Sequence, residues 1–148
     1  TEKNKKSQKN KKTTVFLAMG GSDPSEVNIK VLKVLKKFQN IKVNLVTTQA
    51  NKNLNKLEQF VNNNKKNINL YINSNKIASL MNESDFAIVT PSVTLNEVYF
   101  MELPFIAIKT AENQKELYKF LKKKKFLCMS KFKKKKLKKF IGKLLIKK

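Results

Sequence analysis

The sequence predicts an α/β fold, a Rossmann-like doubly wound parallel sheet with helices on both faces. From residue 13 onward, short apolar segments alternate with longer segments whose hydrophobic residues recur at helical spacing. The short segments are hydrophobic at consecutive positions, as strands covered on both faces require. Strands that alternate with helices at this spacing build a parallel sheet.

The elements follow one another in a regular order. The apolar runs predict strands at residues 14–19, 42–48, 68–72, 85–90, 104–108 and 126–129. Helical periodicity predicts helices at residues 26–38, 53–63, 76–81, 94–101, 114–123 and 133–146. The last helix is amphipathic and basic, because lysines surround one apolar stripe made of Leu137, Phe140, Ile141, Leu144 and Leu145.

The length of 148 residues suits one domain with its own hydrophobic core. Residues 1–12 are polar and lysine-rich, and we interpret them as a linker or the cut end of a longer chain. Residues 13–148 then form a single domain. No apolar run has the length of a membrane span, and no signal peptide is visible. Together with the lone Cys128, this predicts a cytoplasmic protein without disulfides.

The composition excludes several kinds of chemistry. The chain has no histidine and no cysteine cluster, so we expect neither a metal ion nor another cofactor. Without histidine it also lacks the commonest general base. No serine or cysteine nucleophile with a partner base stands out, and no pair of carboxylates does. We therefore assign no catalytic residue to this chain.

The formal net charge of +23 has two interpretations. All 33 basic residues are lysines, whereas recognition of bases and phosphates favours the bidentate guanidinium of arginine. Asparagine and isoleucine are also abundant, as in proteins from AT-rich genomes. Compositional bias therefore explains the charge without a nucleic-acid partner, and the alternative is a surface that binds polyanions.

A glycine turn between the first strand and the first helix is one candidate binding site. Free N–H groups and a helix start at the carboxyl end of a strand are where α/β sheets hold phosphate. The alternative needs no ligand: Asp23 caps the helix, Pro24 takes its first position, and Glu26 completes a capping box. The residues of this candidate site are Gly20, Gly21, Ser22 and Asp23.

The loop after the fourth strand is the second candidate site. Its backbone N–H groups could face a diphosphate, and Glu97 one turn later could accept bonds from both hydroxyls of a ribose. The alternative is again a capping box, formed by Thr94 with Glu97. The diphosphate loop comprises Ser92, Val93, Thr94, Leu95 and Asn96.

Asn113 and Gln114, after the fifth strand, form the third candidate, since their amides suit phosphate or sugar hydroxyls. All the candidate loops follow parallel strands and therefore belong at one edge of the sheet, where ligands of this fold class bind. The pattern indicates a nucleotide-binding domain without its own catalytic base.

Taken together, the segments FLAMGGSD, KIASLMNESD, TPSVTLNE and AENQ resemble a known family. They are similar to the C-terminal half of the UDP-sugar hydrolases of pseudaminic acid biosynthesis, relatives of the N-acetylglucosaminyltransferases of cell-wall synthesis. The resemblance runs from about residue 14 to residue 123 and leaves out the basic end.

The resemblance implies a two-domain glycosyltransferase-B architecture in which this chain is the nucleotide-binding half. It implies hydrolysis of a UDP-linked diacetamido-trideoxy-altrose to UDP and free sugar, with help from a histidine of the N-terminal domain. By position, Glu97 corresponds to the ribose-binding glutamate and residues 92–96 to the diphosphate loop. Ile72 corresponds to the segment whose backbone meets uracil. Asn113 and Gln114 correspond to the loop that faces phosphates and sugar, and residues 20–23 to the glycine loop at the cleft.

The N-terminal domain is absent here, so we expect this chain to bind UDP weakly and to hydrolyse nothing. Its partners would be a UDP-sugar and that missing domain. A UDP-sugar-dependent glycosyltransferase domain is an alternative, as is a lysine-rich module for polyanions or membrane surfaces. The last helix would accordingly either pack on the domain or lie on an anionic membrane.

Overall fold

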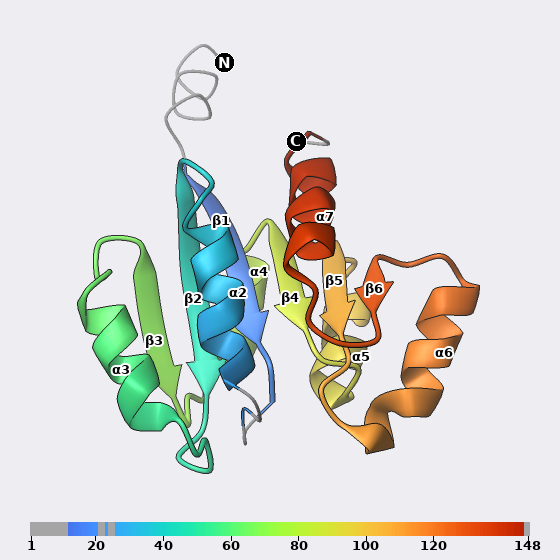
Figure 1. The fold of residues 1–148 in the computed structure, drawn as a ribbon, viewed down its shortest axis with the longest axis horizontal. Helices are drawn as coiled ribbons and strands as arrows, with labels where there is room; N and C mark the ends of the chain where they lie inside the picture. Colours follow the sequence, from blue (N-terminus) through green and yellow to red (C-terminus); the bar gives the residue numbers. More distant parts are fainter. Residues whose placement is uncertain (1–11, 21–22, 24–25, 147–148) are drawn as a thin grey trace.

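The computed structural model describes residues 12–20, 23 and 26–146, and it confirms the predicted α/β fold. One six-stranded, all-parallel sheet has the order β3-β2-β1-β4-β5-β6 (Figure 1). The strands are β1 (Thr13–Ala18), β2 (Ile41–Thr47), β3 (Ile68–Ile72), β4 (Phe86–Val89), β5 (Phe105–Ile108) and β6 (Cys128–Met129). The helices are α2 (Val27–Leu35), α3 (Leu54–Asn62), α4 (Ile77–Asn82), α5 (Val93–Phe100), α6 (Lys115–Lys123) and α7 (Lys134–Ile146), with a short 3-10 turn η2 (Glu112–Gln114) before α6.

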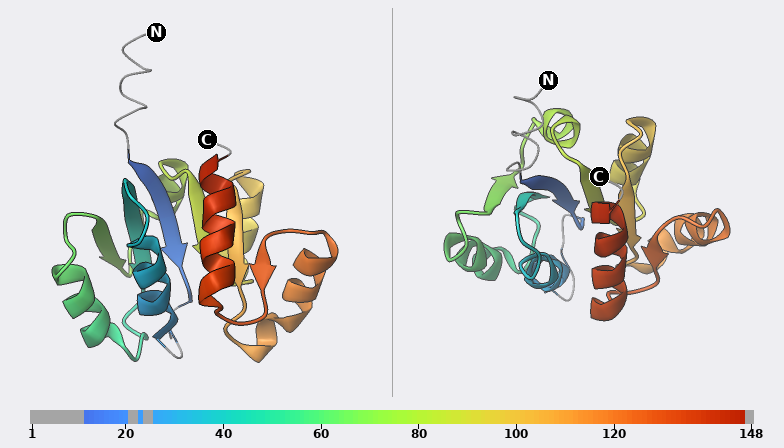
Figure 2. Two further views of the ribbon diagram at one scale, coloured as in Figure 1. Left: turned by 45° about the horizontal axis from the view of Figure 1, so that its top comes forward. Right: turned by 90° about the horizontal axis from the view of Figure 1, so that it is seen from above.

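Helices cover both faces of the sheet, as Figure 2 shows from above. Alternate residues of the central strand β1 point to opposite faces, so Leu17 joins one core and Phe16 the other. The first core lies under α2, α3 and α7, and the second under α4, α5 and α6. Because β1, β4 and β5 are buried on both sides, their sequences are hydrophobic at consecutive positions.

A reciprocal pair of hydrogen bonds fixes the start of the β1–β4 pairing. The N–H of Thr14 donates to the Asp85 carboxylate over 2.8 Å, and the N–H of Asp85 donates to the Thr14 carbonyl over 2.7 Å. This clamp sets the register in which Val15 lies opposite Phe86 and Ala18 opposite Val89. The two central strands therefore end level with each other.

Several predicted elements are shorter than expected, among them the fourth strand, which is Phe86–Val89 rather than 85–90. The first helix ends at Leu35 rather than at residue 38, although Phe38 still packs against the core. The sixth strand is limited to Cys128–Met129. Lys125 adopts a left-handed φ of 63°, and the Phe126 ring stacks on Phe105 with centroids 5.2 Å apart. This turn places Phe126 beside the sheet before the strand begins.

Helix α7 packs on the domain through its apolar stripe. Leu137, Phe140, Ile141 and Leu144 are buried in the core beneath α2, and Leu145 is partly buried against it. The stripe is therefore occupied by the protein's own core, and the outward side of α7 carries mainly lysines. Among the described residues, no helix is both long and apolar enough to cross a membrane.

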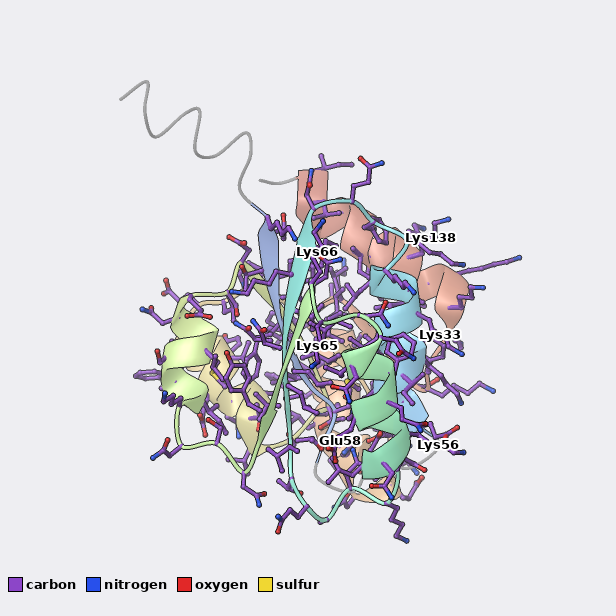
Figure 3. All side chains as sticks on the ribbon, turned by 90° about the vertical axis from the view of Figure 1, so that its left-hand side faces the viewer. Lys33, Lys56, Glu58, Lys65, Lys66 and Lys138 are labelled. Atoms are coloured by element: carbon purple, nitrogen blue, oxygen red, sulfur yellow. The ribbon has the colours of Figure 1, made fainter. Side chains whose placement is uncertain are left out.

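The outer side of α2, α3 and α7 is strongly basic. Figure 3 shows Lys33, Lys56 and Lys138 on the outer side of this helix layer. Just after α2, the interaction with the nearby side chain of Lys134 lowers the pKa of Lys37. Lysines from α7 and from the end of α2 are thus close neighbours on this surface.

We predict that Ile141→Ala lowers the free energy of unfolding by about 2–5 kcal/mol, because it opens a cavity under α7. Ile146→Ala is the matched control: this side chain is 86% exposed, so its loss should change stability by no more than about 0.5 kcal/mol. Urea titration followed by circular dichroism measures both. Equal effects of the two substitutions would show that α7 is not part of the core.

Candidate functional site

The candidate site lies at the carboxyl edge of the sheet, where the strand order reverses. The chain runs from β1 outward to β2 and β3, then returns to β4 on the other side of β1. Ligands of doubly wound sheets bind at this switch point. Ala18 pairs with Val89, and Val89 with Ala107, so the loops after β1, β4 and β5 begin side by side. The predicted convergence of these loops is therefore present.

The loop after β1 begins at Gly20, whose φ of 86° suits glycine. Gly21, Ser22 and Pro24 lie outside the described residues. Asp23 is buried, and its carboxylate accepts a hydrogen bond of 3.1 Å from the N–H of Asn28. Asp23 therefore accepts a hydrogen bond from the first turn of α2, although the helix starts at Val27 and not at the predicted position next to Asp23.

The predicted capping box of Asp23 with Glu26 is wrong. Glu26 precedes the helix in a left-handed conformation with φ of 54°, and α2 starts only at Val27. The Glu26 carboxylate instead pairs with the ammonium group of Lys56 at 2.9 Å, and this contact lowers its pKa. The spacing matched a capping box, but the helix starts four residues after Asp23.

Asp23 is also the centre of a buried polar network that the sequence did not reveal. Its carboxylate accepts a bond of 3.3 Å from the amide of Asn51, which also donates to the Thr47 hydroxyl over 3.1 Å. The amide of Asn53 donates to the Asp23 carbonyl over 2.9 Å. The network ties the loop after β1 to the loop after β2. Burial raises the pKa of Asp23, although the hydrogen bonds from Asn28 and Asn51 oppose this effect.

The start of α5 is open, in contrast to that of α2. Ser92 precedes the helix in an extended conformation, and its hydroxyl lies 3.3 Å from both the hydroxyl and the carbonyl of Thr90 rather than on a helix N–H. The N–H groups of Leu95 and Asn96 donate to the Ser92 carbonyl. Within the described part of the chain, those of Val93 and Thr94 have no acceptor.

The predicted capping box of Thr94 with Glu97 is also wrong, because the helix already starts at Val93 and no side chain caps it. Glu97 is exposed on the outer side of α5, together with Val93 and Asn96, whereas Leu95 is buried. Leu95 can therefore contribute only backbone, and its N–H is already used. The open N–H pair and Glu97 are the parts of this loop available to a ligand.

The loop after β5 is organised by Gln114. Its side-chain oxygen accepts bonds from the N–H groups of Thr110 at 2.7 Å and Ala111 at 3.3 Å, so only its amide nitrogen remains to donate. Asn113 is exposed. Lys109 was not predicted as a site residue. It directly follows β5, its side chain is partly buried, and its ammonium group lies 3.4 Å from the Glu112 carboxylate. The sequence pattern that could have indicated it is a lysine directly after a buried strand.

Ile72 lies apart from these loops. It ends β3, at the same edge of the sheet but three strand positions from β4. At the usual strand spacing this is roughly 14 Å. Ile72 can therefore meet only the far end of an extended ligand that starts at α5.

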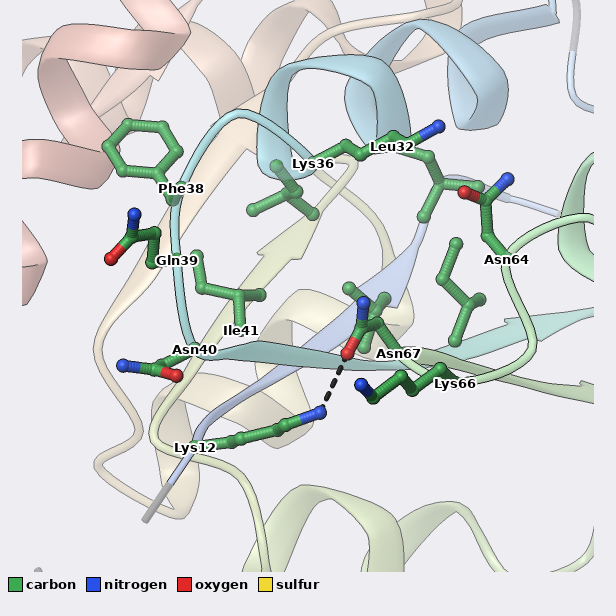
Figure 4. A pocket seen from close by; sticks show the side chains of 13 residues that line it. Lys12, Leu32, Lys36, Phe38, Gln39, Asn40, Ile41, Asn64, Lys66 and Asn67 are labelled. Atoms are coloured by element: carbon green, nitrogen blue, oxygen red, sulfur yellow. Dashed lines mark hydrogen bonds between the residues drawn. The ribbon is translucent and has the colours of Figure 1, made fainter. Parts of the chain in front are cut away.

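Three cavities in the described part of the chain lie away from the candidate site. One of about 380 Å³ opens at the opposite edge, between Leu35, Ile41 and Asn67, beside a 2.7 Å hydrogen bond from Lys12 to Asn67 (Figure 4). Others of about 480 and 710 Å³ lie beside α3 and α5. None of these three cavities is lined by a residue of the candidate site, so we base the site on backbone donors and charge.

Comparisons with known proteins relate this chain distantly to a nucleotide-sugar enzyme. No protein-family model matches the chain. It is 34% identical over 119 residues to the UDP-2,4-diacetamido-2,4,6-trideoxy-beta-L-altropyranose hydrolase of Campylobacter jejuni, covering 80% of this chain and 42% of that protein. It is 36% identical over 121 residues to an uncharacterized protein of Methanocaldococcus jannaschii, covering 78% of this chain and 25% of that one.

The chain thus spans less than half the length of these curated relatives, and the relationship to the hydrolase is distant. Among solved structures, a dodecameric FMN-dependent UbiX-like decarboxylase from Escherichia coli O157:H7 is similar, with a TM-score of 0.56 over 91% of this chain and 94% of that chain. The sequence identity is 12%, so this similarity shows the Rossmann-like fold alone.

We predict that Asp23→Asn removes a pH-dependent loss of stability. Because the folded-state pKa of Asp23 is raised, the folded protein binds the proton more tightly than the unfolded chain does. Its contribution to stability is therefore greatest at low pH and falls as pH rises from about 4 through the folded pKa. In urea titrations across this range, the free energy of unfolding of the variant should rise relative to that of the wild type as pH increases.

The exposed carboxyl of Glu116 provides the control, since Glu116→Gln should leave the pH profile almost unchanged. Loss of a hydrogen bond at Asp23 would shift stability equally at every pH. A constant offset between the two curves would therefore contradict the assigned role of burial.

Proposed function

We propose that this chain is the nucleotide-binding domain of a UDP-sugar hydrolase that releases UDP and a diacetamido-trideoxy sugar in pseudaminic acid biosynthesis. The observation that carries the proposal is the open start of α5 at the switch point of the sheet. There the N–H groups of Val93 and Thr94 lack acceptors and Glu97 is exposed one turn later. The distant relationship to a UDP-sugar hydrolase supports the choice of ligand.

The electrostatics of α5 favour a diphosphate. The helix has no acidic residue in its first turn, so nothing offsets the positive end of its dipole. Lys109 follows the neighbouring strand β5 at the same edge of the sheet, and the Glu112 carboxylate 3.4 Å away offsets part of its positive charge. At α2, by contrast, the Asp23 carboxylate occupies the helix start. A diphosphate would therefore bind at α5 rather than at α2.

Glu97 would then bind the ribose. A carboxylate has two oxygens, each able to accept one hydrogen bond, and this matches the two vicinal hydroxyls of a ribose. From there the uracil would extend along the edge toward Ile72, and the sugar would face Asn113 and the amide of Gln114. Gly20 would border the diphosphate from the loop after β1.

Hydrolysis needs a base to activate water, and this chain contains no histidine. We propose that a further domain, placed opposite the carboxyl edge in a glycosyltransferase-B arrangement, supplies it. This chain alone would then bind UDP without turning over a UDP-sugar. A glycosyltransferase would use the same UDP site, because acceptor and water are both handled outside it.

The first test removes one backbone donor. We predict that Val93→Pro weakens UDP binding about five- to tenfold, because proline lacks the N–H yet suits the first position of a helix. Isothermal titration calorimetry measures the affinity, and circular dichroism confirms that the fold is kept. Unchanged affinity in a folded variant would contradict a diphosphate at this helix start.

The second test removes the ribose contact. We predict that Glu97→Ala reduces the free energy of UDP binding by about 1–3 kcal/mol, as expected for hydrogen bonds to a charged group. Glu58→Ala removes the same charge from an exposed position of α3 outside the candidate loops and should bind UDP like the wild type.

Binding that withstands moderate salt distinguishes this site from a lysine surface. A lysine surface binds anions by charge alone, so its affinity falls steeply with salt and does not depend on the base or the ribose. If UDP and inorganic pyrophosphate bound equally and both were displaced by salt, the lysine-rich module would be the better assignment.

A further inference from the structure

Helix α5 exposes an unusual amount of apolar surface. Of the six large hydrophobic side chains that are exposed among the described residues, four are Val93, Tyr99, Phe100 and Met101. Phe100 is 88% exposed. Apolar side chains that gather at one place on a surface mark a site of interaction.

The carboxyl-terminal end of α5 borders a groove of about 710 Å³. Aromatic rings hold its shape: Tyr99 meets Phe126 edge-on with centroids 5.8 Å apart, and Phe126 stacks on Phe105. We use the term α5 patch for Tyr99, Phe100, Met101 and this groove. The groove is a built apolar surface rather than a single stray side chain.

Lysine is missing from the segment that contains α5, although Lys125 lines the groove from the turn after α6. The chain has 33 lysines, yet none occurs between Lys76 and Lys109, a stretch that contains α4, β4, α5 and β5. A general compositional bias would have placed lysines at the exposed positions of α4 and α5, as it does on α2, α3, α6 and α7. Aromatic and methionine side chains without lysine are typical of the buried centre of a protein interface.

We propose that the α5 patch is the interface for a second copy of this chain. With a net charge of +23, two copies repel each other through every lysine-bearing face. At the α5 patch they can approach without opposing lysine rows, and contact there removes the exposed rings from water.

Two charged residues at the groove fit a symmetric pair. Glu102 follows α5 and Lys125 follows α6, and both line the groove from left-handed turns with φ of 57° and 63°. Neither makes an ion pair within the described part of the chain. In a two-fold arrangement, residue i contacts residue j and j contacts i. Glu102 of each copy can therefore pair with Lys125 of the other.

This inference does not depend on the proposed UDP site. The open N–H groups lie at the first turn of α5, and the patch lies at its last turn. A helix of eight residues is about 12 Å long, so the two sites use opposite ends of it. Variants at Phe100 or Glu102 leave the residues of the UDP site in place.

Sedimentation velocity over a concentration series up to about 1 mM tests the proposal. We expect a monomer–dimer equilibrium that shifts toward the dimer when NaCl rises from about 50 to about 500 mM, since salt screens the repulsion between the copies. Phe100→Lys should weaken dimerisation at least about tenfold. Phe120→Lys is the matched control: this phenylalanine is also exposed but lies on α6 away from the groove, and its replacement should not change the dimer.

Substitutions at Glu102 and Lys125 provide a second test of the proposal. Glu102→Lys should weaken the dimer, and adding Lys125→Glu should restore it, because the pair is then reversed across the interface. A protein that stays monomeric throughout, or a dimer unaffected by Phe100→Lys, would overturn the proposal. Association that weakens with salt would also overturn it, because ion pairs rather than burial of the exposed rings would then hold the copies together.

Discussion

The pairing of β1 with β4 is the constraint on which the rest of this structure depends. These strands are far apart in sequence, and the hydrogen bonds between Thr14 and Asp85 lock their starts together. Once the two strands are parallel and in register, the chain must leave β1 on one side and return on the other. Their following loops then lie together at one edge, and the helices after them begin there. Both cores form as a consequence, since each side of the sheet receives its own helices.

Most of the fold could be predicted from sequence because it depends on burial. A strand such as Phe86–Val89, hydrophobic at every position, has no stable place except inside a doubly covered sheet. The positions at which the helices start were harder to predict. Asp23 with Glu26 and Thr94 with Glu97 both have the spacing of a capping box, yet neither forms one. Local spacing does not reveal that Glu26 turns left-handed or that α5 starts one residue before Thr94.

The candidate site was predictable only where backbone position decides it. The convergence of the loops follows from parallel strands, and the exposure of Glu97 follows from its place on α5 opposite the buried Leu95 and Val98. The roles of Asn51 and Gln114 were not predictable in the same way. Asn51 reaches Asp23 from another loop, and Gln114 uses its oxygen on its own loop. Such contacts depend on tertiary distances that a linear pattern does not contain.

The two helix starts at the switch point differ in charge, and this difference would orient a ligand bound along the edge of the sheet. At α2, a carboxylate that belongs to the protein already fills the place of an anion, held there by Asn28 and Asn51. At α5, the equivalent place is vacant. A charged ligand with two dissimilar ends would consequently find one orientation favoured before any contact with its neutral end is made. The buried carboxylate of Asp23 would in this way set the orientation of such a ligand, with its anionic end at α5 and its neutral end further along the edge of the sheet.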